Sequence, residues 1–158
     1  MIYKNNKLFI DKILVDKIIK KFGTPGYCYS YNQQKKNILI TGGAGNIGSY
    51  ILDKVLEQNP KQCIVVDNLF NSDKSNSNLK NDLVKFYPLD ISKLDEMEYI
   101  FKTYKPDYVF HCASMLIQDS EVLPRKSINT NIMGTFNIVD LSNKYGVEKI
   151  CYSSSASV

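Results

Sequence analysis

Three glycines, each three residues apart, stand between an apolar run and a helical pattern, and this arrangement constrains the fold most strongly. Gly42, Gly45 and Gly48 follow the apolar run 38–40 and open the amphipathic stretch 47–57. Gly42 permits a sharp turn out of a strand, Gly45 lets a ligand approach the backbone, and Gly48 lets the helix pack tightly. The segment therefore predicts a strand, a glycine turn and a helix, in that order.

Short apolar runs continue to alternate with helical patterns after this turn. Residues 63–66, 84–87, 108–110 and 147–152 are typical of buried strands, and a long helical pattern covers 128–145. Strands separated by helices pair in parallel, with helices on both faces of the sheet. The sequence therefore predicts an α/β fold, a Rossmann-type doubly wound parallel sheet that is truncated after about five strands.

The first 36 residues differ from the rest in charge and in pattern. The chain carries a net charge of +4, but residues 1–36 hold eight lysines against two aspartates, and residues 37–158 hold twelve basic against fourteen acidic residues. Apolar residues recur at helical spacing from Ile13 to Phe22, and Gly23 would end that helix. We expect a basic leader with one helix at 1–36 and an incomplete nucleotide-binding domain at 37–158.

Several classes of protein are disfavoured by the sequence. No apolar run approaches the roughly 20 residues of a membrane helix, and no signal-peptide core follows the N-terminus. Cysteines at 28, 63, 112 and 151 lie too far apart for a CxxC-type metal or redox pair. The basic leader could contact nucleic acid, but a solvated helix face explains its lysines as well. We expect a cytoplasmic protein with no metal, nucleic-acid or membrane partner.

The glycine turn and the next strand end predict a dinucleotide site. Free N–H groups of the turn and the positive end of the helix would face a pyrophosphate. Asp67 ends the second strand nineteen residues after Gly48, where a carboxylate can accept hydrogen bonds from the adenosine ribose. Its charge would also repel a 2′-phosphate. The predicted cofactor is therefore NAD rather than NADP.

Polar and small residues follow the later strands as well, at the same carboxyl edge of the sheet. Asp90 and Ile91 follow the third strand, where Asp90 can bond the adenine edge, cap a helix, or do both. The small residues 112–114 would let a dinucleotide pass, and His111 is either structural or part of the cofactor site. Among Ser153–Ser155, a hydroxyl could bond a substrate hydroxyl that is being oxidised.

Six segments in register over residues 37–158 resemble the NAD-dependent epimerase/dehydratase family. This is the extended short-chain dehydrogenase/reductase group, which includes UDP-glucose 4-epimerase. The resemblance implies a nucleotide-sugar substrate, transient hydride transfer from a sugar carbon to NAD, and a homodimer formed through helices near 92–103 and 128–145. The segments are Thr41–Gly48, Asp67–Leu69, Asp90–Ile91, His111–Ser114, Asn131–Thr135 and Ser153–Ala156.

The resemblance also implies a role for each matched residue. The glycine turn would hold the pyrophosphate, and residues 112–114 would lie under the dinucleotide. Asp67 and Asn68 would hold the adenosine ribose, and Asp90 and Ile91 would flank the adenine. Asn131 would stabilise the active-site helix and the cofactor region, and Ser155 matches the catalytic serine. The cofactor-binding residues are thus expected to be Gly42, Gly45, Asn46, Ile47, Gly48, Asp67, Asn68, Asp90, Ile91, Cys112, Ala113, Ser114 and Asn131.

The sequence departs from the family beyond the serine motif. The family's Tyr-x-x-x-Lys lies farther on than Val158, and no such pair occurs upstream in the proper context. The expected function is therefore that of the cofactor-binding half of a nucleotide-sugar epimerase/dehydratase. The alternative is a catalytically inactive NAD-binding fragment or regulatory module.

Residues 1–36 do not resemble this family. Residues 22–30, preceded by the helical pattern, resemble the extreme N-terminus of diaminopimelate decarboxylase, a pyridoxal-phosphate enzyme. Only that opening segment is matched, without the cofactor lysine or the barrel. The resemblance implies a fusion, and no decarboxylase chemistry follows from it.

Overall fold

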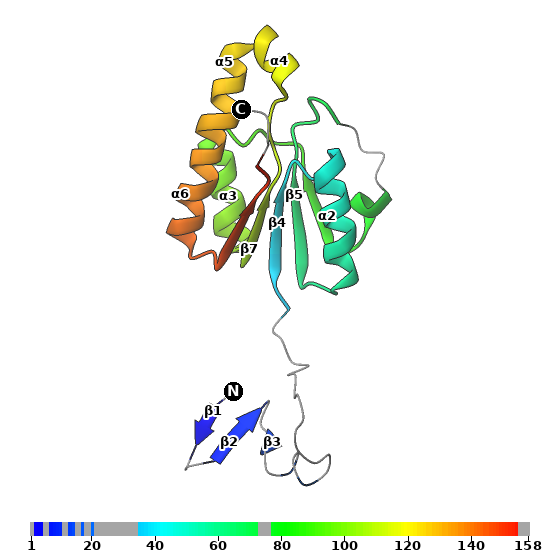
Figure 1. Ribbon diagram of the computed structural model, residues 1–158, viewed down its shortest axis with the longest axis vertical. Coiled ribbons are helices and arrows are strands. Elements are labelled where there is room, and N and C mark those ends of the chain that lie inside the picture. The colour runs from blue at the N-terminus through cyan, green and yellow to red at the C-terminus, as the bar shows by residue number, and fades with distance from the viewer. Residues whose placement is uncertain are drawn as a thin grey trace. The chain divides into compact units, whose positions relative to one another are not determined.

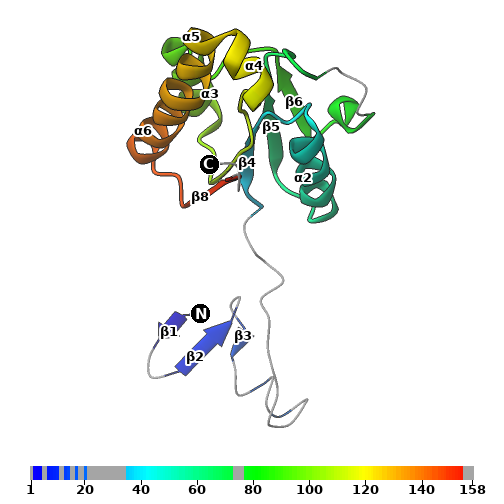
Figure 2. The same cartoon turned by 45° about the horizontal axis from the view of Figure 1, so that its top comes forward.

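The structure is a computed structural model that describes residues 2–4, 7–10, 13–14, 17, 20, 35–72 and 77–154. The chain forms two compact units, Met1–Gln34 and Lys35–Val158. Figures 1 and 2 together label the α-helices and strands of both units. None of the helices within the described ranges is long and apolar enough to cross a membrane.

The first unit contains a small antiparallel sheet that the sequence pattern did not predict. It consists of β1 (Ile2–Lys4), β2 (Lys7–Ile10) and β3 (Ile13–Leu14), and Ile10 pairs with Ile13. The prediction of a helix is therefore wrong at Ile13 and Leu14. These residues pair with an adjacent strand of β-favouring residues, and this pairing outweighs the helical spacing. Lys17 and Lys20 are helical, and residues 21–34 lie outside the described residues.

The second unit confirms the Rossmann-type fold. Its parallel strands are β4 (Asn37–Thr41), β5 (Gln62–Val66), β6 (Val84–Tyr87), β7 (Tyr108–His111) and β8 (Lys149–Tyr152). Their order in the sheet is β6-β5-β4-β7-β8. The chain thus runs outward from β4 to β6 and then returns to β7 on the other side. This reversal opens a crevice beyond the carboxyl ends of β4 and β7.

Helices cover both faces of the sheet, as expected for a doubly wound fold. The helix α2 (Asn46–Glu57) covers one face, and α3 (Leu94–Tyr104) and α6 (Thr135–Tyr145) cover the other (Figures 1 and 2). The expected long helix is continuous from residue 124 to 145. It comprises α5 (Pro124–Ser127), a π-helical segment η2 (Ile128–Gly134) and α6, and is preceded by α4 (Ile117–Val122). A 3₁₀ turn, η1 (Ser77–Lys80), precedes β6.

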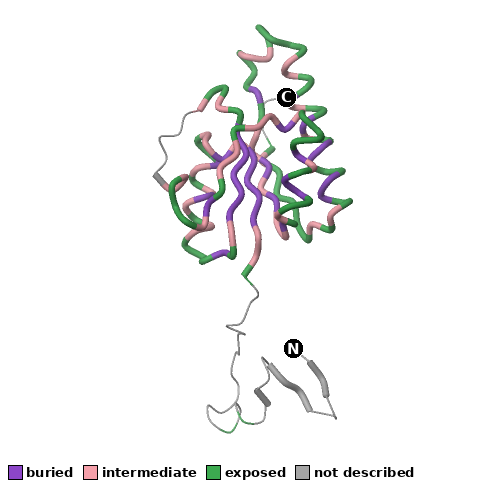
Figure 3. Tube along the Cα trace, turned by 180° about the vertical axis from the view of Figure 1, so that it is seen from behind, coloured by how far each residue is buried: buried purple, intermediate pink, exposed green. Residues whose placement is uncertain are grey.

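The core forms two clusters, one on each face of the central strands, which Figure 3 shows as buried. Leu39 and Ile64 pack toward α3 and α6, whereas Ile40 and Val65 pack toward Leu52 of α2. Alternate residues of each strand serve opposite faces, and both faces are covered. Unbroken apolar runs in the sequence therefore mark the central strands of this sheet.

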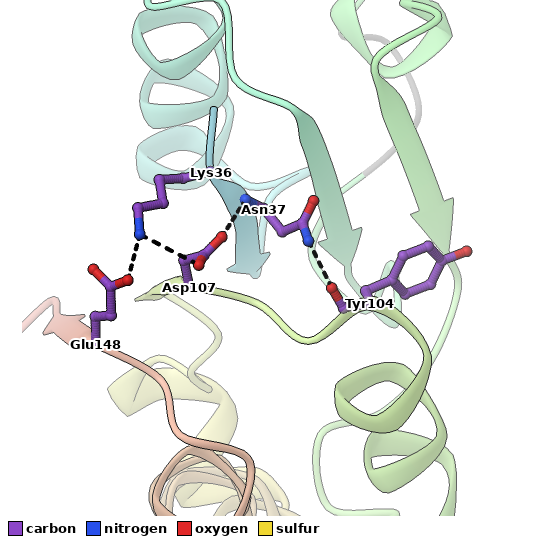
Figure 4. A network of polar contacts seen from close by, with 5 residues as sticks. All are labelled: Lys36, Asn37, Tyr104, Asp107 and Glu148. Atoms are coloured by element: carbon purple, nitrogen blue, oxygen red, sulfur yellow. Dashed lines mark hydrogen bonds and ion pairs between the residues drawn. The ribbon is translucent and has the colours of Figure 1, made fainter. Parts of the chain in front are cut away.

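A polar network ties together the amino ends of the strands, and we call it the amino-edge network (Figure 4). Lys36 Nζ forms ion pairs with Asp107, at 3.4 Å, and with Glu148. Asp107 Oδ2 accepts the Asn37 N–H at 2.7 Å, and Asn37 Nδ2 donates to the Tyr104 carbonyl at 2.9 Å. The network joins the start of β4 to the segments that precede β7 and β8. Lys36, which we expected in the leader, thus lies within the second unit.

Candidate functional site

The glycine turn folds back tightly on itself and on the end of β7. Gly42 has a φ of +68°, and a Cβ there would lie 2.6 Å from the backbone nitrogen of Ala113. A Cβ on Gly48 would lie 2.2 Å from the Gly42 carbonyl oxygen. Neither position has room for a side chain. Gly42 and Gly48 therefore permit the sharp turn and the close helix contact that the sequence predicted.

The amino end of α2 carries no side-chain cap. Its N-cap residue is Gly45, no side chain bonds the first-turn amides, and no acidic residue lies in the first turn. The first N–H groups of a helix have no partner within the helix, and they lie at the positive end of its dipole. Both side chains after Gly45, Asn46 and Ile47, are exposed. This turn can therefore bind an anionic group through its backbone.

Asp67 lies next to this turn, and the turn partly holds it in place. Only 8% of the residue is exposed. Its Oδ2 accepts the Ala44 N–H at 3.0 Å, and its Oδ1 accepts the Leu69 N–H at 2.8 Å and the Ser72 hydroxyl at 2.9 Å. A carboxylate offers about four acceptor positions. These bonds therefore leave about one acceptor position, on Oδ2, for a ligand.

A single crevice brings together most of the residues that the sequence singled out. Its lining also includes residues that the sequence did not single out, namely Phe70, Asn71, Ser72, Met115 and Thr130. Asn46 lines an adjoining hollow with Ala44 and Gly45. The expected cofactor-binding residues that line the crevice itself are Gly42, Gly45, Asp67, Asn68, Ile91, Cys112, Ala113 and Ser114.

Asp90 lies behind the crevice lining and positions Asn68. Its Oδ2 accepts a hydrogen bond from Asn68 Nδ2 at 3.2 Å, and its Oδ1 accepts the Ser92 N–H at 2.9 Å. Burial opposes ionisation of Asp90, but the bonds from Ser92 and Asn68 and the charge of Lys126 outweigh it and lower the pKa. The expected helix-cap role is wrong, because α3 begins at Leu94 after the N-cap residue Lys93.

Asn131 also acts from behind the lining. Its Oδ1 accepts the Met115 N–H at 2.7 Å, and its Nδ2 donates to the Met115 carbonyl at 3.1 Å. Both bonds fix the segment after β7, which supplies Ala113 and Ser114 to the crevice. The π-helical segment η2 thus presents an amide that holds one wall of the crevice in place.

Ile91 is likewise held from the η2–α6 side. A Cβ on Gly134 would lie 2.6 Å from Ile91 Cδ1, and the Asn137 amide donates to the Ile91 carbonyl at 3.0 Å. Ile91 is only 3% exposed, yet it reaches the crevice. Its position depends on a glycine that lies more than forty residues farther along the chain.

His111 has a structural environment. Its Nδ1 is hydrogen-bonded to Thr41 Oγ1 at 2.6 Å and its Nε2 to Thr135 Oγ1 at 2.9 Å, and its ring stacks on Tyr152. Burial lowers the pKa of His111 to about 4, so the ring is neutral at pH 7. Of the two alternatives for this residue, the structure favours the structural one, in which His111 joins β4, β7 and α6.

Thr130 is a residue of the crevice that sequence reasoning missed. It is 5% exposed, and its Oγ1 has no hydrogen-bond partner within the described parts of the chain. It lines the crevice from η2. A buried hydroxyl without a partner is costly, so a ligand in the crevice is a natural partner for it. A threonine within a helical pattern gives no sequence signal of such a role.

The structure describes the candidate catalytic residues only in part. Ser153 Oγ donates to the His111 carbonyl at 3.2 Å, and Ser155 lies outside the described residues. Tyr145 and Lys149 have the Tyr-x-x-x-Lys spacing, but Tyr145 ends α6 and donates to Glu98. That hydrogen bond raises the pKa of Tyr145, whereas a tyrosine that acts as a base needs a lowered pKa. The described residues also contain no cluster of three or more potential metal ligands.

The chain matches one protein family over most of its length. Residues 38–158 match the sequence model described as the NAD dependent epimerase/dehydratase family. UDP-glucose 4-epimerase of Bacillus subtilis is 34% identical over 126 residues, which cover 77% of this chain and 37% of that protein. The chain therefore spans little more than a third of the length of this relative.

Solved structures of related proteins show the same fold. UDP-glucose 4-epimerase of Thermotoga maritima, crystallised with UDP-glucose, is 41% identical with a TM-score of 0.70, and the match covers 75% of this chain and 38% of that one. The Thermus thermophilus enzyme, in complex with NAD, is 30% identical with a TM-score of 0.65, and the match covers 72% and 36%.

Proposed function

Because the chain belongs to the NAD-dependent epimerase/dehydratase family, we propose that its crevice binds NAD as the cofactor-binding part of a nucleotide-sugar epimerase/dehydratase. The supporting observation is that the uncapped end of α2 and the buried Asp67 carboxylate meet in one crevice. An anion-binding helix end beside a ribose-binding carboxylate suits a dinucleotide.

Each part of the crevice has a stated role in this proposal. The amides after Gly45 bind the pyrophosphate, and the remaining acceptor position of Asp67 takes a ribose hydroxyl. Asn68, held by Asp90, supports the same ribose, and Ile91 lies beside the adenine. Residues 112–114 lie under the dinucleotide, and the Thr130 hydroxyl gains its missing hydrogen-bond partner from it. The Asp67 charge disfavours the 2′-phosphate of NADP.

The substrate and the catalytic step belong to the proposal as well. The Thermotoga maritima relative was crystallised with UDP-glucose, which supports a nucleotide sugar as the substrate. NAD would supply the hydride acceptor. We propose that Ser155 bonds a sugar hydroxyl during its oxidation. The cytoplasm is the proposed location, supported by the free thiols of all three described cysteines.

An apolar stripe on the helix after α5 supports a homodimer. Ile132 and Phe136 are each 61% exposed, and Ile128 and Val139 are about half exposed. They recur every three or four residues, so they share one face of η2 and α6. Large exposed apolar patches mark association sites. Sedimentation should show a dimer that Phe136→Lys converts to a monomer, and a monomeric parent chain would refute the proposal.

Calorimetric titration of the chain with NAD and NADP tests the cofactor assignment. Asp67→Asn keeps the shape of the side chain, so we expect it to weaken NAD binding by about tenfold and to narrow the preference over NADP. Asp82→Asn, at an exposed acid in the turn before β6, is the matched control. Equal NAD affinity in Asp67→Asn and the parent chain would refute the role of Asp67.

An epimerase assay on the same sample separates the enzyme from a binding module. Turnover of UDP-glucose would support the enzyme, and tight NAD binding without turnover would support the alternative of an inactive NAD-binding module. Within an active protein, Ser155→Ala should lower kcat by at least about 100-fold with NAD affinity unchanged.

A further inference from the structure

Two contacts join the opposite walls of the crevice at its mouth. Asn71 Nδ2 donates to Asp119 Oδ2 of α4, and Lys126 Nζ of α5 lies 3.6 Å from the centre of the Phe70 ring. Asn71 and Phe70 line the crevice, but Asp119 and Lys126 do not. The contacts therefore tie the segment after β5 to the helices after β7, from outside the space that a ligand would fill.

The helix on one side of these contacts has little hydrophobic anchoring. No residue of α4 is buried, and Leu116, Ile117 and Val122 are 60%, 60% and 77% exposed. Figures 1 and 2 place α4 beyond the carboxyl ends of the strands. An element with few buried contacts opens at low free-energy cost. Polar contacts such as that of Asp119 are therefore a large part of what holds α4 against the crevice.

The opposite side of α4 is fixed more firmly. Asn131 holds Met115 through two hydrogen bonds just before α4, and Ser127 Oγ donates to Ser120 Oγ at 2.8 Å. These bonds connect α4 to η2 and α5, not to the segment after β5. Loss of the contacts across the mouth would therefore free α4 from one wall while it stayed attached to the other. In this arrangement α4 can move away from the segment after β5 while the core stays folded.

We propose that the pair Asn71–Asp119 and Phe70–Lys126 is a latch that opens to admit the dinucleotide and closes again over it. The inference rests on the proposed function, because NAD is the ligand whose entry the latch would control. The latch residues Asp119 and Lys126 do not line the crevice, so a bound ligand does not compete for them. The latch therefore slows entry and exit together, with little effect on the equilibrium.

Stopped-flow fluorescence of NADH binding tests the latch. The variants Asp119→Ala and Asp119→Leu alter only a latch partner that lies outside the lining, and Glu121→Ala is the matched control on α4. Lys126 is left unchanged because its charge also acts on Asp90. We expect each latch variant to raise both the association and the dissociation rate by about three- to tenfold, with Kd changed by less than about twofold. Rates equal to those of the parent chain, or a change in Kd alone, would overturn the proposal.

Hydrogen exchange of the free chain gives a readout that does not depend on NAD. Amides of residues 117–122 should exchange faster in Asp119→Ala than in the parent chain or in Glu121→Ala. Unchanged exchange in that segment would overturn the latch. If the parent chain failed to bind NADH at all, the proposed function would fail, and faster exchange in Asp119→Ala would still support the contact itself.

Discussion

At the amino edge of the sheet, Lys36 pairs with Asp107 and Glu148, and Asn37 pairs with Asp107 and the Tyr104 carbonyl. At the carboxyl edge, the first turn of α2 has no side-chain cap and the buried Thr130 hydroxyl has no partner among the described residues. The side chains of the amino-edge network thus pair with one another, whereas the first amides of α2 and the Thr130 hydroxyl face a crevice.

The difference shows how this fold separates stability from binding. A buried polar group without a partner costs free energy, so the carboxyl edge holds its groups in place by backbone geometry and by residues behind the lining, such as Asp90 and Asn131. The amino edge does not have to keep polar groups free for a ligand, so its charged side chains form ion pairs with one another. Substitutions at the two edges should therefore have different consequences, which four experiments can test.

The largest expected effect lies at the carboxyl edge, in the glycine turn. A Cβ on Gly48 would meet the Gly42 carbonyl oxygen at 2.2 Å, and two backbone segments would have to separate. We expect Gly48→Ala to lower the free energy of unfolding by about 3 kcal/mol or more. Gly146→Ala, at a φ of +72° with nothing within 4 Å of the added Cβ, should cost only about 1–2 kcal/mol. Urea unfolding followed by circular dichroism measures both, and equal losses would contradict the crowding argument.

The next effect is a pH dependence that arises from His111. Burial lowers the pKa of His111 to about 4 from an ordinary value of 6.5, so between these values the unfolded chain binds the proton more tightly. Stability is therefore fully present above the higher value and is lost as the pH falls toward the lower one. From pH 7 to pH 5 the loss should be about 2 kcal/mol.

Urea unfolding at several pH values between 7 and 5 measures this slope. His111 is the only histidine in the sequence, so His111→Gln should remove most of the slope in that range. A slope that persisted in the variant would show that another group titrates there and that the histidine is not held neutral.

A smaller effect is expected at the amino edge, from Asp107. Asp107→Ala leaves the Asn37 N–H without its carboxylate partner, so the free energy of unfolding should fall by about 1 kcal/mol. Because Asp107 lies at the opposite edge from the crevice, NAD affinity should stay at the value of the parent chain. Titration of the variant with NAD checks this, and weaker binding would break the proposed separation of the two edges.

The smallest effect is expected from Lys36. Its pKa is raised, chiefly by the hydrogen bond to Glu148, but the side chain is accessible to solvent. Exposed ion pairs contribute little and are screened by salt. Lys36→Met should therefore shift the urea midpoint less than Asp107→Ala does. High salt should abolish the shift of Lys36→Met relative to the parent chain. A shift that did not respond to salt would assign the effect to packing of the aliphatic stem instead.

The sequence allowed us to predict most of the second unit because its signals are local. Apolar runs such as 38–40 and 63–66 indicated strands with both faces covered, and Gly42, Gly48 and Asp67 gave the turn and its acidic neighbour. In the first unit the same reasoning failed at Ile13 and Leu14, which form β3. Helical spacing over a short stretch does not reveal that an adjacent strand offers hydrogen bonds.

By itself, then, the sequence determined the order of the elements, the parallel sheet and the place of the glycine turn, because propensity and periodicity act between near neighbours. Only the tertiary structure decided which residues meet across the chain. It showed that Thr130 faces the crevice, that Asn131 holds Met115, and that His111 lies between two threonines. Such contacts join residues up to seventy positions apart, and their partners are set by how the helices cover the sheet.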